Sequence, residues 1–166
     1  GSVNAGGVTI FFTINLVTGD MTIQGDGTGE MGNYGGICND REFIWYKYEK
    51  YIKRIIVEES VTSVGDYAFL GLSSLKEVVL PDGVTYIGFA AFSGCSSLVS
   101  ITIPSTVTRI DEAAFCNCSS LTSVELPKNV LVLSSSMFYG CNNLKNIMLP
   151  SDLTEIGGYV FYKCTS

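Results

Sequence analysis

The sequence predicts a β-rich solenoid in which five coils of 23 residues stack into a short rod. The first observation is a phenylalanine that recurs every 23 residues, at Phe69, Phe92, Phe115, Phe138 and Phe161. The second is a proline with the same interval, at Pro81, Pro104, Pro127 and Pro150. The third is an aliphatic residue that opens each unit, at Ile52, Leu75, Leu98, Leu121 and Leu144. Such a period is typical of repeat architectures, in which each unit buries the apolar face of the one before.

Each unit is expected to contain one strand, a turn and a second short extended piece. The triplets "VVL", "ITI", "VEL" and "IML" alternate with a period of two, which directs side chains such as Val78 and Leu80 inward. Pro81 ends the strand because it cannot donate to a β-ladder. The residue two after each phenylalanine is expected to have a left-handed backbone. These residues are Gly71, Gly94, Asn117, Gly140 and, as a poorer fit, Lys163.

The chain divides into an N-terminal cap at residues 1–51 and the repeat array at residues 52–166. In the cap, "VTIFFTI" and "MTIQ" predict a β-hairpin around a turn at Thr18–Asp20. A glycine-rich loop, "GDGTGEMGNYGG", and an aromatic, basic segment, "REFIWYKYEKYIK", follow the hairpin, and the latter is expected to form a short helix. The opening Gly1-Ser2 has the character of a cloning remnant and is left out of fold reasoning.

The array ends at Ser166, the last residue of a unit, without a turn toward a polar cap. A terminal coil without a cap exposes an apolar edge. Two expectations follow: either natural repeats continue beyond this point, or the uncapped C-terminal coil associates end to end with a neighbour.

Composition and charge exclude several classes of function. The net charge is −6, so electrostatics do not support a nucleic-acid partner. Histidine is absent, which removes Ser-His and Cys-His pairs, a histidine base and histidine-ligated zinc. No apolar run approaches the roughly 20 residues of a transmembrane helix. We therefore predict a non-catalytic protein without cofactors.

The glycine-rich loop contains two patterns that resemble ligand sites. Gly27, Gly29 and Gly32 match a dinucleotide fingerprint, but "NYGG" follows where a helix N-terminus would be needed to hold the phosphates. Carboxylates in and before the loop could supply oxygen ligands for calcium, but their spacing matches no EF-hand; they are Asp20, Asp26 and Glu30. We interpret the segment as a solvated loop and predict no metal site.

Four cysteines follow the 23-residue period, at Cys95, Cys118, Cys141 and Cys164. Equivalent Cα atoms on adjacent coils lie ~4.8 Å apart, a separation that a disulfide tolerates. However, Leu72 occupies the same position in the first unit, which indicates an apolar slot where a free thiol packs well. A buried, reduced ladder is the favoured interpretation, with disulfides and a metal site as alternatives. Cys116 lies off this ladder and has no neighbouring base.

The segments "VTSVGDYAFLGLSSLKEVVLPDGVTYIG" and "SGCSSLVSITIPSTVTRI" resemble the BspA-like leucine-rich repeats. That 23-residue class is found in surface proteins of gut and oral bacteria and of some mucosal protozoa. The resemblance covers residues 52–166, and "NLVTGDMTIQGDGTGEM" with "WYKYEKYIKRIIVEESVTSVGDYAF" is similar to the segment before such repeats in gut Firmicutes. It implies a right-handed leucine-rich repeat solenoid that is secreted or displayed at the cell surface and serves adhesion or recognition.

Alternation also predicts which strand side chains point away from the core, on what should be the concave face. They form two columns of candidate ligand-binding residues: Arg54, Glu77, Ser100, Ser123 and Asn146 in one, and Ile56, Val79, Thr102, Glu125 and Met148 in the other. A second candidate is the aromatic run in the cap, for which packing is the alternative explanation. It comprises Trp45, Tyr46 and Tyr48.

These features favour a binding module that engages a host or neighbouring-cell protein or glycoprotein through its concave face. The alternative is a structural spacer that holds another domain at the cell surface. Carboxylate-based glycan hydrolysis ranks last, because Glu77 and Glu125 lie two coils apart on a shallow face. The fourth unit has Leu131 where the others have threonine, a departure that marks either a contact site or neutral drift.

Overall fold

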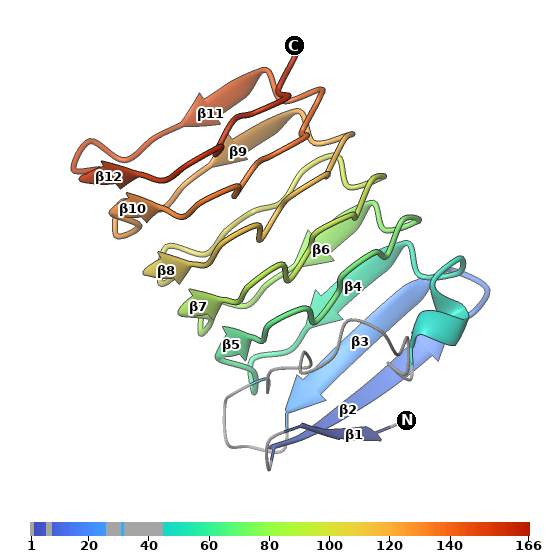
Figure 1. Ribbon diagram of the computed structural model, residues 1–166. Coiled ribbons are helices and arrows are strands. Elements are labelled where there is room, and N and C mark those ends of the chain that lie inside the picture. Colours follow the sequence, from blue (N-terminus) through green and yellow to red (C-terminus); the bar gives the residue numbers. More distant parts are fainter. Residues whose placement is uncertain (1, 6–7, 26–30, 32–44) are drawn as a thin grey trace.

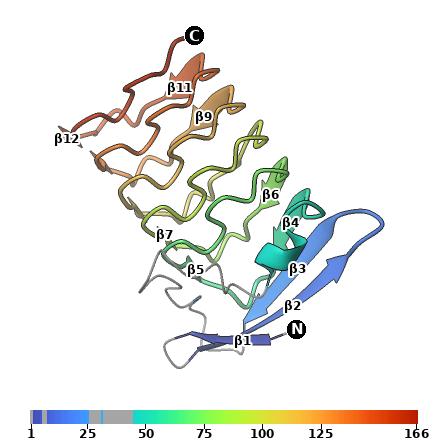
Figure 2. The ribbon, with the colours of Figure 1, turned by 45° about the vertical axis from the view of Figure 1, so that its right-hand side comes forward.

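The computed structural model describes residues 2–5, 8–25, 31 and 45–166. Two series of short strands run along opposite sides of a stack of coils (Figures 1 and 2). The first series comprises β4 (Arg54–Val57), β6 (Glu77–Val79), β9 (Ser123–Glu125) and β11 (Asn146–Met148). The second comprises β5 (Ser63–Val64), β7 (Tyr86–Ile87), β8 (Arg109–Ile110), β10 (Val132–Leu133) and β12 (Glu155–Ile156). This arrangement confirms the predicted β-solenoid with its 23-residue spacing.

The predicted hairpin is present at the N-terminal end of the stack. It consists of β2 (Val8–Asn15) and β3 (Asp20–Gly25), which pair antiparallel, and β1 (Ser2–Ala5) adds a further antiparallel strand that we did not predict. Strand β3 then pairs in parallel with β4, so the hairpin extends the sheet of the first coils. The aromatic segment contributes one short 3-10 helix, η1 (Tyr46–Tyr48).

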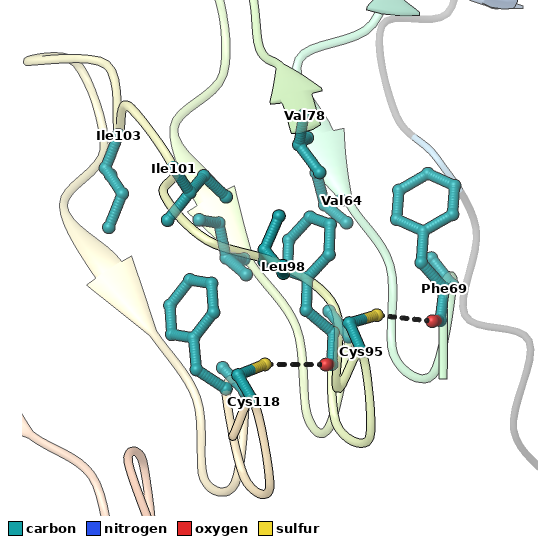
Figure 3. Packing of buried hydrophobic residues seen from close by; sticks show 14 of the residues in the cluster. Val64, Phe69, Val78, Cys95, Leu98, Ile101, Ile103 and Cys118 are labelled. Atoms are coloured by element: carbon teal, nitrogen blue, oxygen red, sulfur yellow. Dashed lines mark hydrogen bonds between the residues drawn. The ribbon is translucent and has the colours of Figure 1, made fainter. Parts of the chain in front are cut away.

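A stack of phenylalanine rings forms the centre of the solenoid. Successive rings from Phe69 to Phe161 lie 5.4 to 6.0 Å apart between centroids, in stacked geometry. Trp45 continues this stack beyond Phe69, and Phe12 of the hairpin meets the Trp45 ring edge to face. The hairpin and the coils therefore share one core, and Figure 3 shows part of its packing.

The periodic cysteines are free thiols that point into this core. Each donates a hydrogen bond of 3.1 to 3.2 Å to the phenylalanine carbonyl of the preceding coil, as Cys95 does to Phe69 and Cys118 to Phe92 (Figure 3). The ladder thus links neighbouring coils through side chain to backbone bonds. In the structure Cys95, Cys118 and Cys141 are buried free thiols and Cys164 is a partly buried one, an arrangement that agrees with the favoured interpretation; Cys38 lies outside the described residues.

The left-handed backbone expected after each phenylalanine is present, including at Lys163, where φ is 63°. A second left-handed series was not predicted, because none of its members is glycine. Its residues are Tyr67, Ala90, Ala113, Ser136 and Tyr159, with φ between 50° and 60°. Each coil therefore contains two left-handed residues, and both follow its second strand.

We expect Gly94→Ala to lower the free energy of unfolding by about 1–2 kcal/mol, since a Cβ disfavours a left-handed backbone. The new methyl group would meet Gly71 at 3.4 Å, an ordinary contact, so strain at φ 76° is the main cause. Urea denaturation followed by circular dichroism measures the loss. Ser74→Ala, in the neighbouring turn but outside the left-handed series, is the matched control and should change stability little.

The third coil departs from the predicted strand pattern. Its triplet "ITI" forms no strand, and a single bridge joins Ser100 to Ser123 of β9. On the other side, the bond from the Val99 amide to the Lys76 carbonyl is long, at 3.4 Å. Ile101 and Ile103 still point into the core, so the inward alternation holds although the ladder is interrupted.

Candidate functional site

Alternation along the first strand series places one set of side chains in the core and the next on the surface. In β6 and β9 the central valine is buried and both flanking residues are exposed. Strand pairing then aligns equivalent residues of neighbouring coils, as for Arg54 with Glu77 and Ile56 with Val79. Ser123 and Glu125 align with Asn146 and Met148 in the same way. We call this surface the strand face.

The structure brings all ten predicted residues together on the strand face. Ser100 joins its column through the bridge to Ser123, and Thr102 lines the same hollow as Glu125. Arg54 and Ile56 are half-buried, whereas the other eight are exposed. Their participation in binding remains a prediction.

The strand face continues onto the hairpin, a continuation that we did not predict. Because β3 and β4 are parallel and in register, Asp20 lies beside Arg54 and Thr22 beside Ile56. Thr13 of β2 extends the second column by one further strand. The signal was present in "DMTIQ", whose alternation matches that of the coil strands, but sequence alone did not show that β3 pairs with β4.

Small polar groups and carboxylates dominate the strand face. Arg54 forms an ion pair of 3.2 Å with Glu77, both partly exposed, a contact that contributes little to stability because solvent screens it. Two apolar side chains interrupt the polar surface: Val79 is 37% exposed and Met148 is 64% exposed. Such a surface suits many shallow contacts with another protein.

Two hollows flank these columns. One, of about 420 Å³, lies beside the third coil and is lined in part by Ser100, Thr102 and Glu125. The other, of about 600 Å³, lies at the ends of β4 and β6 and includes Glu58, Glu59 and Asp82 on its wall. Glu125 lines the first hollow, whereas Glu77 is paired with Arg54. These two carboxylates are therefore not positioned as the general acid and base of a glycan hydrolase.

The aromatic run of the cap belongs mainly to the packing of the first coils. Trp45 is 1% exposed and contacts Phe12 and Phe69, so its ring offers no surface to a ligand. Tyr46 donates its hydroxyl to the Leu70 carbonyl, and Tyr48 packs against the core while half-buried. The packing alternative therefore accounts for Trp45, which we remove from the candidate ligand-binding residues.

Among residues 2–5, 8–25, 31 and 45–166, no group of three or more potential metal ligands is found. The fingerprint glycines and Asp26 and Glu30 lie outside this set. No helix in the described part of the chain has the length and apolar character to span a bilayer.

Comparisons with known proteins agree with this architecture. A family model described as a BspA type leucine-rich repeat region matches residues 42–166 in six copies, and so begins before the coil that we placed first, at Ile52. No curated protein matches the chain. The division at residues 51 and 52 remains a prediction.

Several solved structures share the fold. A leucine-rich repeat protein from Eubacterium ventriosum is 25% identical with a TM-score of 0.75, and the match covers 99% of this chain and 42% of that one. A leucine-rich cell surface protein from Faecalibacterium prausnitzii is 26% identical with a TM-score of 0.64, covering 99% and 52%. The leucine-rich repeat protein of T. pallidum is 25% identical with a TM-score of 0.66, covering 93% and 64%. The chain thus spans less than two thirds of the length of each.

The family is established by two independent features. The matching model covers most of the chain, and the stacked phenylalanines and cysteines show the 23-residue spacing in three dimensions. This chain belongs to the BspA-type leucine-rich repeat family.

Proposed function

We propose that this chain is a secreted or cell-surface binding module that recognises a host or neighbouring-cell protein or glycoprotein through the strand face. The observation that carries the proposal is that equivalent outward-pointing residues line up from the hairpin to β11, although the hydrogen-bond ladder is interrupted at the third coil. Leucine-rich repeat proteins generally bind other proteins, and one similar structure is described as a cell surface protein. Adhesion is the role that we infer for it.

A pre-formed face supports this function energetically. The strands are held by parallel pairing and by a core that includes Val78 and Val124, so little ordering accompanies binding. The exposed hydroxyl groups of Ser100, Thr102 and Ser123 offer hydrogen bonds at regular intervals. Met148 and Val79 provide the apolar contacts that shallow polar surfaces need for affinity.

The proposal is tested by solid-phase binding to a panel of extracellular matrix proteins and mucins. Thr102→Arg combined with Ser123→Arg places two bulky charges in the middle of the strand face. We expect saturable binding by the wild type and a loss of about tenfold or more in this variant, because two bulky charged side chains disrupt the shape and charge complementarity of a shallow interface.

The matched control is Ser73→Arg combined with Ser151→Arg. It adds the same charge at two exposed turns outside the strand face. Equal weakening in both variants would show that net charge matters and the face does not. A wild type that binds nothing on the panel would favour the spacer hypothesis instead.

A further inference from the structure

The second strand series is joined by a ladder of threonines. The amides of Thr85 and Thr108 each donate to the equivalent carbonyl one coil earlier, at 2.9 and 3.0 Å, and Thr154 donates to Leu131 at 2.8 Å. Their hydroxyl groups reach the same carbonyls at 2.9 to 3.4 Å. Each threonine thus ties its coil to the preceding one through two donors.

The ladder is broken at Leu131. Within the described part of the chain, no hydrogen bond joins Leu131 to Thr108, and β8 does not pair with β10. The Ile110 carbonyl accepts instead from the Ser134 hydroxyl, at 2.6 Å. The sheet of this side is therefore divided into β5-β7-β8 and β10-β12, and Figure 1 shows β10 set apart from β8. Leu131 has no hydroxyl group, so it cannot form the hydrogen bond that threonine makes at this position in other coils.

A cavity of about 630 Å³ lies at this break. Its wall includes Phe89, Leu131 and Val132, and the last two are 43% and 40% exposed. Surface aliphatic side chains at the edge of a hollow are typical of interaction sites. The break therefore coincides with an apolar recess. The other coils have threonine at the position of Leu131, so they lack this aliphatic side chain.

The charged side chains around the cavity differ in whether they are already paired within the protein. Arg109 is held by Asp111 through two hydrogen bonds of 2.7 and 3.1 Å and lies over the Tyr86 ring. Glu112 and Glu155 also line the cavity, and neither forms an ion pair with another described residue. The rim thus presents two free carboxylates, while its one cation is already neutralised.

We propose that this cavity binds an extended basic peptide segment of a partner protein. An aliphatic side chain of the segment packs against Leu131 and Val132, and its lysine or arginine side chains pair with Glu112 and Glu155. The Thr108 carbonyl and the Leu131 amide form no hydrogen bond to another described residue, so both are available at the break to the backbone of an extended segment. This site lies on the side opposite the strand face and is independent of it.

The probe is a fluorescein-labelled peptide of alternating lysine and leucine, five residues long, with the glutamate and leucine counterpart as the reference. Fluorescence anisotropy measures its affinity for the full chain. We expect Leu131→Thr, which keeps the net charge and restores the threonine ladder, to weaken binding about tenfold, the equivalent of one lost aliphatic contact. Glu112→Gln combined with Glu155→Gln should weaken binding about fivefold, the loss expected when two exposed ion pairs of ordinary strength are removed together.

Two controls separate this site from the strand face. Thr102→Arg combined with Ser123→Arg should leave peptide affinity unchanged, and amide shifts on titration should fall within 108–112 and 131–135. The Leu131→Thr variant should melt at the same temperature as the wild type or higher, which excludes unfolding as the cause. Unchanged affinity in Leu131→Thr, or equal affinity for the acidic peptide, would overturn the proposal.

Discussion

The protein is expected to lose stability steeply as the pH rises from about 9 towards 12. Burial raises the pKa of the Cys95 and Cys141 thiols to about 12 and that of Cys118 well above its ordinary value. In the unfolded chain these thiols ionise near pH 8.5, so above that pH the unfolded state binds fewer protons than the folded state. Below pH 8.5 both states are protonated, and the thiols then cause no pH dependence.

The magnitude follows from proton linkage. Each buried thiol lowers the free energy of unfolding by about 1.4 kcal/mol per pH unit in this window, so three of them lower it by about 4 kcal/mol per pH unit. Urea denaturation at pH 8, 9 and 10 measures the slope. Removing one thiol by Cys118→Ala should reduce the slope by about 1.4 kcal/mol per pH unit.

The neighbouring Ser119→Ala is the control for this series. Its hydroxyl bonds the Ser96 carbonyl at 3.3 Å and does not titrate, so the slope with pH should equal that of the wild type. Other groups that ionise near pH 10 contribute the same amount to the slope in the wild type and in both variants. If Cys118→Ala kept the wild-type slope, the burial of the ladder thiols would be disproved.

Phe115→Ala is expected to lower the free energy of unfolding by about 3–5 kcal/mol, the usual cost of emptying a buried phenylalanine site. The Phe115 ring is fully buried and stacks on Phe92 and Phe138, at 5.6 Å from each. Its removal leaves a cavity between two rings that stay fixed by their own coils. For a chain of this size the melting temperature should fall by roughly 10 °C.

Phe161→Ala is the matched comparison for this change. The Phe161 ring is only partly buried and has one stacking partner, Phe138, at 6.0 Å. Its truncation should therefore cost less than half as much in thermal and urea denaturation monitored by circular dichroism. A similar loss in both variants would contradict the view that stacking on two sides determines the energy.

Much of the fold is determined by local periodicity. Phenylalanine, proline and leucine recur at one interval, so each position in a coil meets its own equivalent in the next coil, and the inward or outward direction of a side chain follows from alternation alone. Val78 and Val124 are buried, and Glu77 and Glu125 are exposed, as this pattern predicts. The cysteine ladder was predictable for the same reason, because Leu72 marks its slot as apolar.

Other features depend on contacts between segments that no period links. The pairing of β3 with β4, which carries the strand face onto the hairpin, joins residues more than 30 positions apart. The burial of Trp45 against Phe12 likewise required the hairpin to lie over the first coil. The sequence marked Leu131 as a departure, but only the tertiary structure showed that its coil loses a ladder and opens a cavity. Hydrogen bonds between coils depend on how far one coil is displaced from the next, and that displacement is decided by the packing of the whole stack.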